Sequence, residues 1–71
     1  MYNKKEEILK VRVKEQYLND FESACKKYKI PYKKYPEPIF FTYKVICDRR
    51  ELKGFSDIII SIETMPKIIL D

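Results

Sequence analysis

Residues 26–44, KKYKIPYKKYPEPIFFTYK, combine cations with aromatic rings, two kinds of group that can bind a polyanion. The segment carries five lysines before its first acidic side chain, Glu37, and tyrosines lie among these lysines. Lysine side chains neutralise phosphates and aromatic rings stack on bases, so this composition is typical of a surface that contacts nucleic acid. The alternative is a solvated helix end followed by a polar linker, in which the lysines need no ligand.

A second group of cations lies near the N-terminus, at alternate positions of the segment EILKVRVK, residues 7–14. Alternate residues of a β-strand share one face of the sheet, so these cations can extend the basic surface. The formal net charge of +4 is therefore concentrated in two blocks, which creates a local field that attracts polyanions. The residues predicted to bind nucleic acid are Lys10, Arg12, Lys14, Lys26, Lys27, Lys29, Tyr32, Lys33, Lys34, Tyr35 and Lys44.

Groups that commonly perform catalysis are scarce in this sequence. It has no histidine, the most frequent general base near neutral pH, and its single glycine excludes a glycine-rich phosphate loop. Asp57 and Glu63 share a strand face, but they lie on the order of 20 Å apart, too far for a catalytic pair. The spacing of Cys25 and Cys47 matches no zinc or redox motif. We therefore expect no enzyme activity, no cofactor and no metal site.

Both cysteines fall among apolar residues, and we expect them to be buried as small hydrophobic side chains. The alternative is a disulfide between them, which a hyperthermophilic source would permit. Abundant Lys and Ile with few Asn and Gln are typical of thermophiles, and equally of an AT-rich genome. Both backgrounds are common among small viral and plasmid proteins.

The period of the apolar residues indicates which elements must position these groups. Apolar residues alternate with polar ones over residues 7–14 and again over 55–63, and residues 39–47 are rich in β-branched and aromatic side chains. These three segments are predicted to be strands. Apolar residues at spacings of one, three and four over residues 15–29 predict an amphipathic helix that ends before Pro31.

The remaining segments are predicted to connect these elements. Residues 31–38 contain three prolines and are expected to form a stiff, extended connector that is not a central strand. Residues 48–54 read as a polar turn that ends at Gly54. Residues 67–70 are expected to form either a short edge strand or part of a tail.

These elements predict a single α+β domain over residues 1–71, in the order β-α-β-β with a further β at its end, and with residues 1–5 and 65–71 as flexible or edge-strand tails. One helix would cover one face of a three- to four-stranded sheet. The first two strands would run parallel through a right-handed crossover, and the second and third would form a hairpin. The predicted core is Leu9, Val11, Val13, Leu18, Phe21, Cys25, Phe41, Val45, Ile58, Ile60 and Ile62.

A single helix covers only one face of such a sheet, so we expect the other face to meet a partner. The cations on that face favour nucleic acid, and the expected function is that of a non-catalytic basic binding protein, a viral or mobile-element regulator. The alternative is a protein-interaction module, a homodimeric inhibitor or assembly factor acting on a host protein. The residues predicted for such an interface are Phe40, Ile46, Ile59, Ile68 and Ile69.

The sequence also suggests where such a protein works. No apolar run approaches the roughly 20 residues that cross a bilayer, and the N-terminal MYNKKEE lacks the apolar segment of a signal peptide. We expect a cytoplasmic protein without membrane contact, in the host cytoplasm if it is viral. We also expect a homo-oligomer, most simply a dimer, because so short a chain buries little surface by itself.

Overall fold

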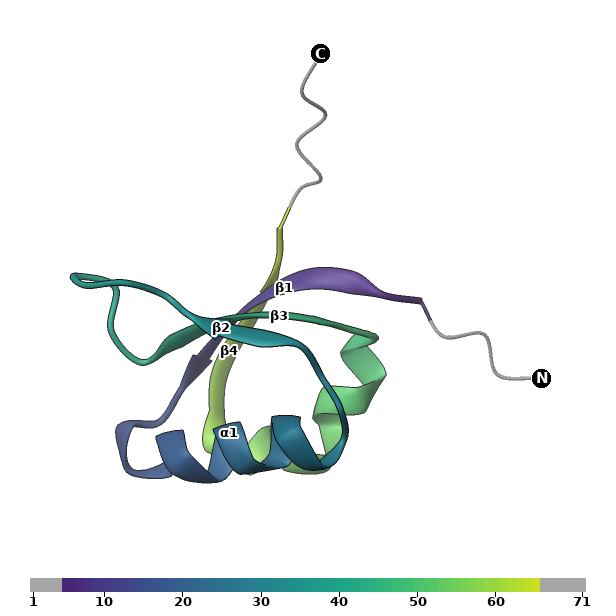
Figure 1. Ribbon diagram of the computed structural model, residues 1–71, viewed down its shortest axis with the longest axis horizontal. Helices are drawn as coiled ribbons and strands as arrows, with labels where there is room; N and C mark the ends of the chain where they lie inside the picture. Colours follow the sequence, from purple (N-terminus) through teal and green to yellow (C-terminus); the bar gives the residue numbers. More distant parts are fainter. Residues whose placement is uncertain (1–4, 66–71) are drawn as a thin grey trace, which may run out of the picture.

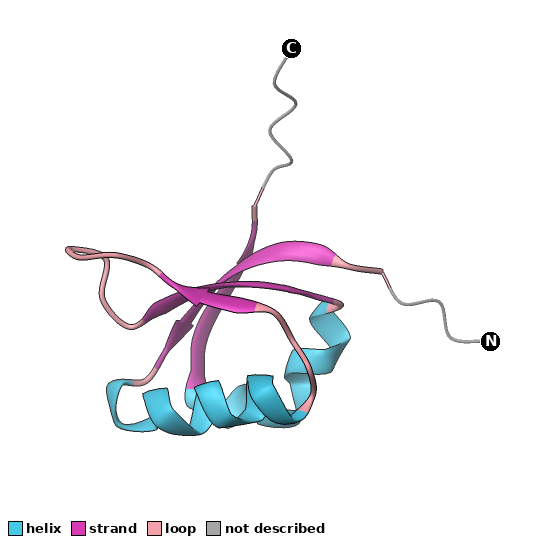
Figure 2. Cartoon of the chain, in the orientation of Figure 1, coloured by secondary structure: helices cyan, strands magenta, loops and turns pink. Residues whose placement is uncertain are grey.

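One α-helix packs on one face of a four-stranded antiparallel sheet, which confirms the predicted α+β class (Figures 1 and 2). The computed structural model describes residues 5–65. Two 3-10 helices, η1 and η2, accompany the α-helix. In chain order the elements are β1 (Glu7–Val13), η1 (Glu15–Tyr17), α1 (Leu18–Lys27), β2 (Tyr32–Lys34), β3 (Thr42–Cys47), η2 (Arg49–Ile58) and β4 (Ile59–Thr64).

The strand order is β2-β3-β1-β4, so β1 lies in the interior of the sheet and pairs with β3 on one side and β4 on the other. Both pairings are antiparallel. The predicted parallel pairing of the first strand with residues 39–47 is therefore wrong, and so is the predicted hairpin between 39–47 and 55–63. The short strand β2 explains the first error. It runs in the same direction as β1, and β3 lies between these two strands and is antiparallel to both of them.

The second error follows from the structure of the chain between β3 and β4. Residues 48–54 were predicted to be a turn, but residues 49–58 form η2, two 3-10 segments separated by a kink at Phe55, where φ is −134° and ψ is 37°. This element leads the chain to the far side of β1. Asp48 starts η2 through a capping box: its carboxylate accepts a hydrogen bond from the Arg50 N–H, and Glu51 Oε2 accepts one from the Asp48 N–H at 2.9 Å. Asp48 is buried, and the Arg50 guanidinium donates to it at 2.7 Å.

The core lies between α1 and the sheet. Phe21 and Cys25 of α1 are fully buried against Leu9, Val11 and Val13 of β1, as their spacing predicted. Tyr43 packs its ring against Phe21, with ring centroids 4.8 Å apart. Val45 is buried as predicted, whereas Ile30, Tyr43, Cys47 and Leu52 are core residues that the predicted set did not include. Leu18, Ile58 and Ile62 are partly buried against this core.

A β-bulge explains two errors in the predicted core. The register of β1 against β4 shifts between Arg12 and Val13, so Val13 faces Ile59 and Arg12 faces Ser61, and Ile60 is passed over. Ile59 consequently packs against the core, and Ile60 is 55% exposed rather than buried. Phe41, also predicted to be in the core, is only half-buried because it precedes β3 with a φ of 59°.

Two further findings complete the architecture. Within residues 5–65, none of the helices has the length and apolar character needed to cross a membrane. The predicted edge strand at 67–70 lies outside the described residues.

Candidate nucleic-acid interface

The sheet face opposite α1 collects cations from three strands. We call this surface the open face. Strand alternation places it on the opposite side from the buried residues Leu9, Val11, Tyr43 and Val45. Its members are Ile8, Lys10, Arg12, Lys33, Tyr35, Thr42, Lys44, Ile46, Ser61 and Glu63.

Three lysines lie directly beside one another across the open face. Lys33 of β2 is opposite Lys44 of β3, and Lys44 is opposite Lys10 of β1. We call these three residues the lysine row. Glu63 of β4 is opposite Lys10 and ends the row. Like charges that are directly opposite in a sheet are destabilising, by roughly 0.2–1 kcal/mol per pair, so the row is an electrostatically unfavourable arrangement in the unliganded protein.

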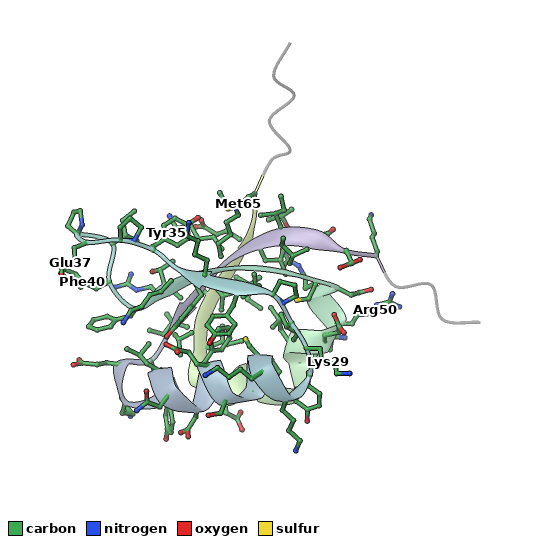
Figure 3. The ribbon with its side chains drawn as sticks, in the orientation of Figure 1. Lys29, Tyr35, Glu37, Phe40, Arg50 and Met65 are labelled. Carbon is green, nitrogen blue, oxygen red and sulfur yellow. The ribbon has the colours of Figure 1, made fainter. Side chains whose placement is uncertain are left out.

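Tyr35 lies across the middle of the open face. Its ring is 5.6 Å from the Lys10 Nζ, a cation–π contact, and its hydroxyl donates a hydrogen bond of 3.2 Å to Met65 Sδ just after β4. Its backbone N–H donates to the Thr42 carbonyl, which extends the pairing of β2 with β3. Figure 3 shows Tyr35 and Met65 on the side of the sheet away from α1. Tyr35 therefore contributes an aromatic surface beside the lysine row.

The β2–β3 loop, residues 35–41, is fixed at both ends. At its start the Ile39 N–H donates to the Pro36 carbonyl, and the Glu37–Pro38 peptide is cis. At its end the Phe41 carbonyl accepts a hydrogen bond of 2.8 Å from Val13, and the Phe40 carbonyl accepts one of 2.9 Å from the Thr42 hydroxyl. These bonds hold the loop against the edge of the open face.

A hollow of about 310 Å³ lies between this loop and the sheet. This volume is at the lower limit of pockets that bind small molecules, roughly 300–1,000 Å³. Loop residues that line it are Pro38, Ile39 and Phe40, and sheet residues that line it are Lys10, Arg12, Thr42, Ser61 and Glu63. The hollow thus joins two cations, a carboxylate and an exposed aromatic ring.

The predicted nucleic-acid-binding residues fall into two groups on different layers of the molecule. Five of them lie together on the open face. Of the others, Lys14 follows β1, and the rest lie at the end of α1 or on the α1 side of β2. Figure 3 shows Lys29 on the α1 side of the molecule. The first group is Lys10, Arg12, Lys33, Tyr35 and Lys44, and the second is Lys14, Lys26, Lys27, Lys29, Tyr32 and Lys34.

The predicted interface residues also separate. Ile46 is on the open face and 38% exposed, and Phe40 is on the β2–β3 loop and 52% exposed. Ile59 was expected on the same face as Ile46 but packs against the core instead, because of the bulge. Ile68 and Ile69 lie outside the described residues.

The titratable groups of the core are arranged around α1. The pKa of the Cys25 thiol is raised to about 12, first by burial and then by electrostatic repulsion from Cys47 and Glu22. Tyr43 donates a hydrogen bond of 2.5 Å to Glu22, and its pKa is raised, first by burial and then by this carboxylate. Both cysteines are buried, in agreement with their predicted place in the core. The raised pKa values keep the Cys25 thiol and the Tyr43 hydroxyl protonated near neutral pH, so neither of these two groups is an activated nucleophile.

The predicted site residues did not include five members of the hollow, which are Pro38, Ile39, Thr42, Ser61 and Glu63. Alternation in residues 55–63 does place Glu63 and Ser61 on one face, which was the available signal for Glu63. The two loop residues gave no such signal, because a loop folds over a face only through hydrogen bonds that have no sequence period. Within residues 5–65, no group of three or more Cys, Asp and Glu side chains is placed to hold a metal ion.

These features describe a cationic sheet face with a hollow beneath the β2–β3 loop and a second hollow beside Tyr35, Lys33 and Lys44. No family model matches the sequence, and neither a curated protein nor a solved structure is significantly similar to the chain.

Proposed function

We propose that the protein binds nucleic acid through the open face, as a non-catalytic binding protein. The observation that carries this proposal is the lysine row, because three lysines at directly opposite positions of neighbouring strands bring like charges to one surface, which an anion over the row would neutralise. A phosphate backbone supplies such an anion at regular spacing, and each phosphate that is neutralised releases counterions. Arg12 and the ring of Tyr35 adjoin the row and add a further cation and a stacking surface.

The salt dependence of binding tests this proposal. Four cations on the open face, Lys10, Arg12, Lys33 and Lys44, should give a slope of log affinity against log salt of about −3.6 for duplex DNA. Replacing two members of the row, in Lys33→Gln/Lys44→Gln, should reduce the magnitude of this slope by about 2 and weaken binding to all sequences equally. Fluorescence anisotropy of a labelled duplex, titrated between 50 and roughly 200 mM salt, measures the slope.

The matched control is Lys26→Gln/Lys27→Gln, which removes the same charge from the end of α1, on the other side of the sheet. We expect this variant to retain the wild-type slope. If both double variants reduce the slope equally, then only the overall charge matters and the open face is not the site. If the wild-type protein binds neither duplex nor single-stranded nucleic acid at 50 mM salt, the proposal is wrong.

A second candidate function is self-association or the binding of another protein through strand β4. The observation that favours it is the position of β4 at one end of the described sheet, with Ile60 exposed at its bulge. An edge strand offers unpaired backbone groups to a further strand, and a second copy of the chain can supply one. This function is compatible with the first, because the edge and the open face are different surfaces.

A further inference from the structure

The hollow beneath the β2–β3 loop contains a group that a phosphate-binding surface does not need. Glu63 ends the lysine row and lines the hollow together with Lys10 and Arg12, so the hollow offers a hydrogen-bond acceptor beside its two cations. A carboxylate accepts hydrogen bonds from amino groups, such as N4 of cytosine. The part of a nucleic acid that fits this position is therefore a base rather than the backbone.

Phe40 supplies the second group that suits a base. Its ring is 52% exposed although a solvated loop has no need of a large apolar side chain, and it lines the hollow beside Pro38 and Ile39. Figure 3 shows Phe40 on the projecting loop, away from α1. An exposed aromatic ring can stack on the face of a base, and removing such a ring lowers the affinity by about 5- to 100-fold.

The hollow is held in place before any ligand binds. The hydrogen bonds from Val13 to the Phe41 carbonyl and from Thr42 to the Phe40 carbonyl hold the backbone at the end of the loop beside β1 and β3, so Phe40 and Glu63 are placed at the same hollow. A binding site that is already formed loses less freedom when its ligand enters. The arrangement of ring, carboxylate and Arg12 is thus a built feature of the fold.

We propose that this hollow receives one unstacked base of a single-stranded nucleic acid, with an amino group of the base on Glu63 and its face on Phe40, while the phosphates follow the lysine row. The inference rests on the proposed function, since it assigns the base to a site beside the predicted phosphate path. In a duplex the bases are paired and stacked, and extracting one costs free energy. The protein should therefore prefer single strands.

The experiment compares labelled 12-residue oligonucleotides at one salt concentration: oligo(dC), oligo(dT) and a mixed-sequence duplex. We expect single strands to bind about tenfold more tightly than the duplex. Phe40→Ala should weaken oligo(dC) binding by about 5- to 100-fold and leave duplex binding unchanged, and Phe40→Tyr should restore the single-strand affinity because it keeps the ring. Tyr28→Ala is the matched control, since Tyr28 is 56% exposed at the end of α1 and its loss should change neither affinity.

A separate variant tests the proposed contact between Glu63 and the amino group of the base. Oligo(dC) should bind about tenfold more tightly than oligo(dT), because thymine has a carbonyl oxygen where cytosine has its amino group. Glu63→Gln should abolish this preference, since an amide can both donate and accept. Melting of each variant, followed by circular dichroism, verifies that it is folded before binding is compared.

The results separate the two proposals. Salt-dependent binding with equal affinity for single strands and duplex, unaffected by Phe40→Ala, would overturn the base site and leave the proposed function intact. Single-strand binding that persists in a folded Phe40→Ala protein would overturn the base site as well. Binding to none of the three oligonucleotides would overturn both proposals together.

Discussion

At the scale of single residues, two buried groups couple the stability of the fold to alkaline pH. Burial of the Cys25 thiol, and then its electrostatic interactions with Cys47 and Glu22, raise its pKa to about 12. The Tyr43 hydroxyl donates to Glu22 from a fully buried ring, so its pKa is raised as well. Each group must remain protonated in the folded protein, whereas in the unfolded chain it ionises at its ordinary pKa, 9.0 for cysteine and 10.0 for tyrosine.

We therefore predict that the free energy of unfolding falls as the pH rises above about 9. Because both folded-state pKa values are raised, the stabilisation is complete below the unfolded pKa and is lost as the pH approaches the folded value. Urea unfolding between pH 7 and pH 11 measures this loss. Cys25→Ala/Tyr43→Phe should show a smaller fall over the same range, although it is less stable at pH 7. An alkaline loss as large as that of the wild-type protein would contradict the assignment.

At the scale of secondary-structure elements, the end of α1 is a Schellman motif that lacks the usual glycine. The Ile30 N–H donates to the Cys25 carbonyl at 2.8 Å, and Lys29 has a φ of 57°. Ile30 is buried, which supplies the apolar contact that accompanies this motif. A non-glycine residue in the left-handed region costs roughly 1–2 kcal/mol. The native protein therefore carries part of this conformational cost at Lys29.

Lys29→Gly should consequently raise the free energy of unfolding, by about 1 kcal/mol, and the melting temperature by about 4–8 °C. Thermal unfolding followed by circular dichroism checks this. Lys27→Gly is the control, because it removes the same charge from a helical position and should lower stability by about 1 kcal/mol. A Lys29→Gly protein that is destabilised like the control would show that Lys29 is not the C-terminal αL residue.

The elements also show how far the sequence can predict this fold. Alternation in residues 7–14 and the apolar stripe of the helix are local signals, and both were sufficient to place Leu9, Val11 and Phe21 in the core. Strand order is not a local property, so the position of β1 between β3 and β4 could not be derived from periods. The bulge at Arg12/Val13 shifts the register by one residue, and this single shift exchanges the predicted faces of Ile59 and Ile60.

The same distinction applies to the candidate site. The types of its residues were evident in the sequence, because lysines and tyrosines alternate in residues 26–35. Their division between two layers was not, because it depends on β2, a three-residue strand in which Lys33 faces Lys44 while Lys34 faces Tyr43. One residue of register in a short edge strand thus decides which lysines can share a ligand.

At the scale of the whole molecule, the flat shape leaves a large surface for the mass. The principal extents are 36 × 34 × 18 Å, and small domains of this size have thin stability margins. Pairing of two copies through β4, which is an edge strand of the sheet within residues 5–65, would lengthen the sheet without covering the lysine row. The predicted dimer remains a prediction, and β4 is the described element best placed to form it.

Mass measurement by light scattering at micromolar concentration tests this arrangement. We expect twice the chain mass of 8.6 kDa. Ile60→Lys, which places a charge on the exposed edge, should give a monomer, because edge charges oppose strand pairing. Ile46→Lys is the control: it introduces the same charge on the open face and should remain dimeric. A wild-type protein of single-chain mass, or a monomer produced equally by both variants, would exclude pairing through β4.

The interior position of β1 also matters during synthesis. A ribosome makes Glu7–Val13 first, but the neighbours of this strand on its two sides begin only at Thr42 and Ile59. At roughly 5–20 residues per second, this segment exists for several seconds before either of its neighbouring strands has been made. Lys10 and Arg12, at alternate positions of that segment, give the nascent chain a positive charge during this interval. Like charges at these positions oppose the pairing of this strand with the same strand of another chain before β3 and β4 are made.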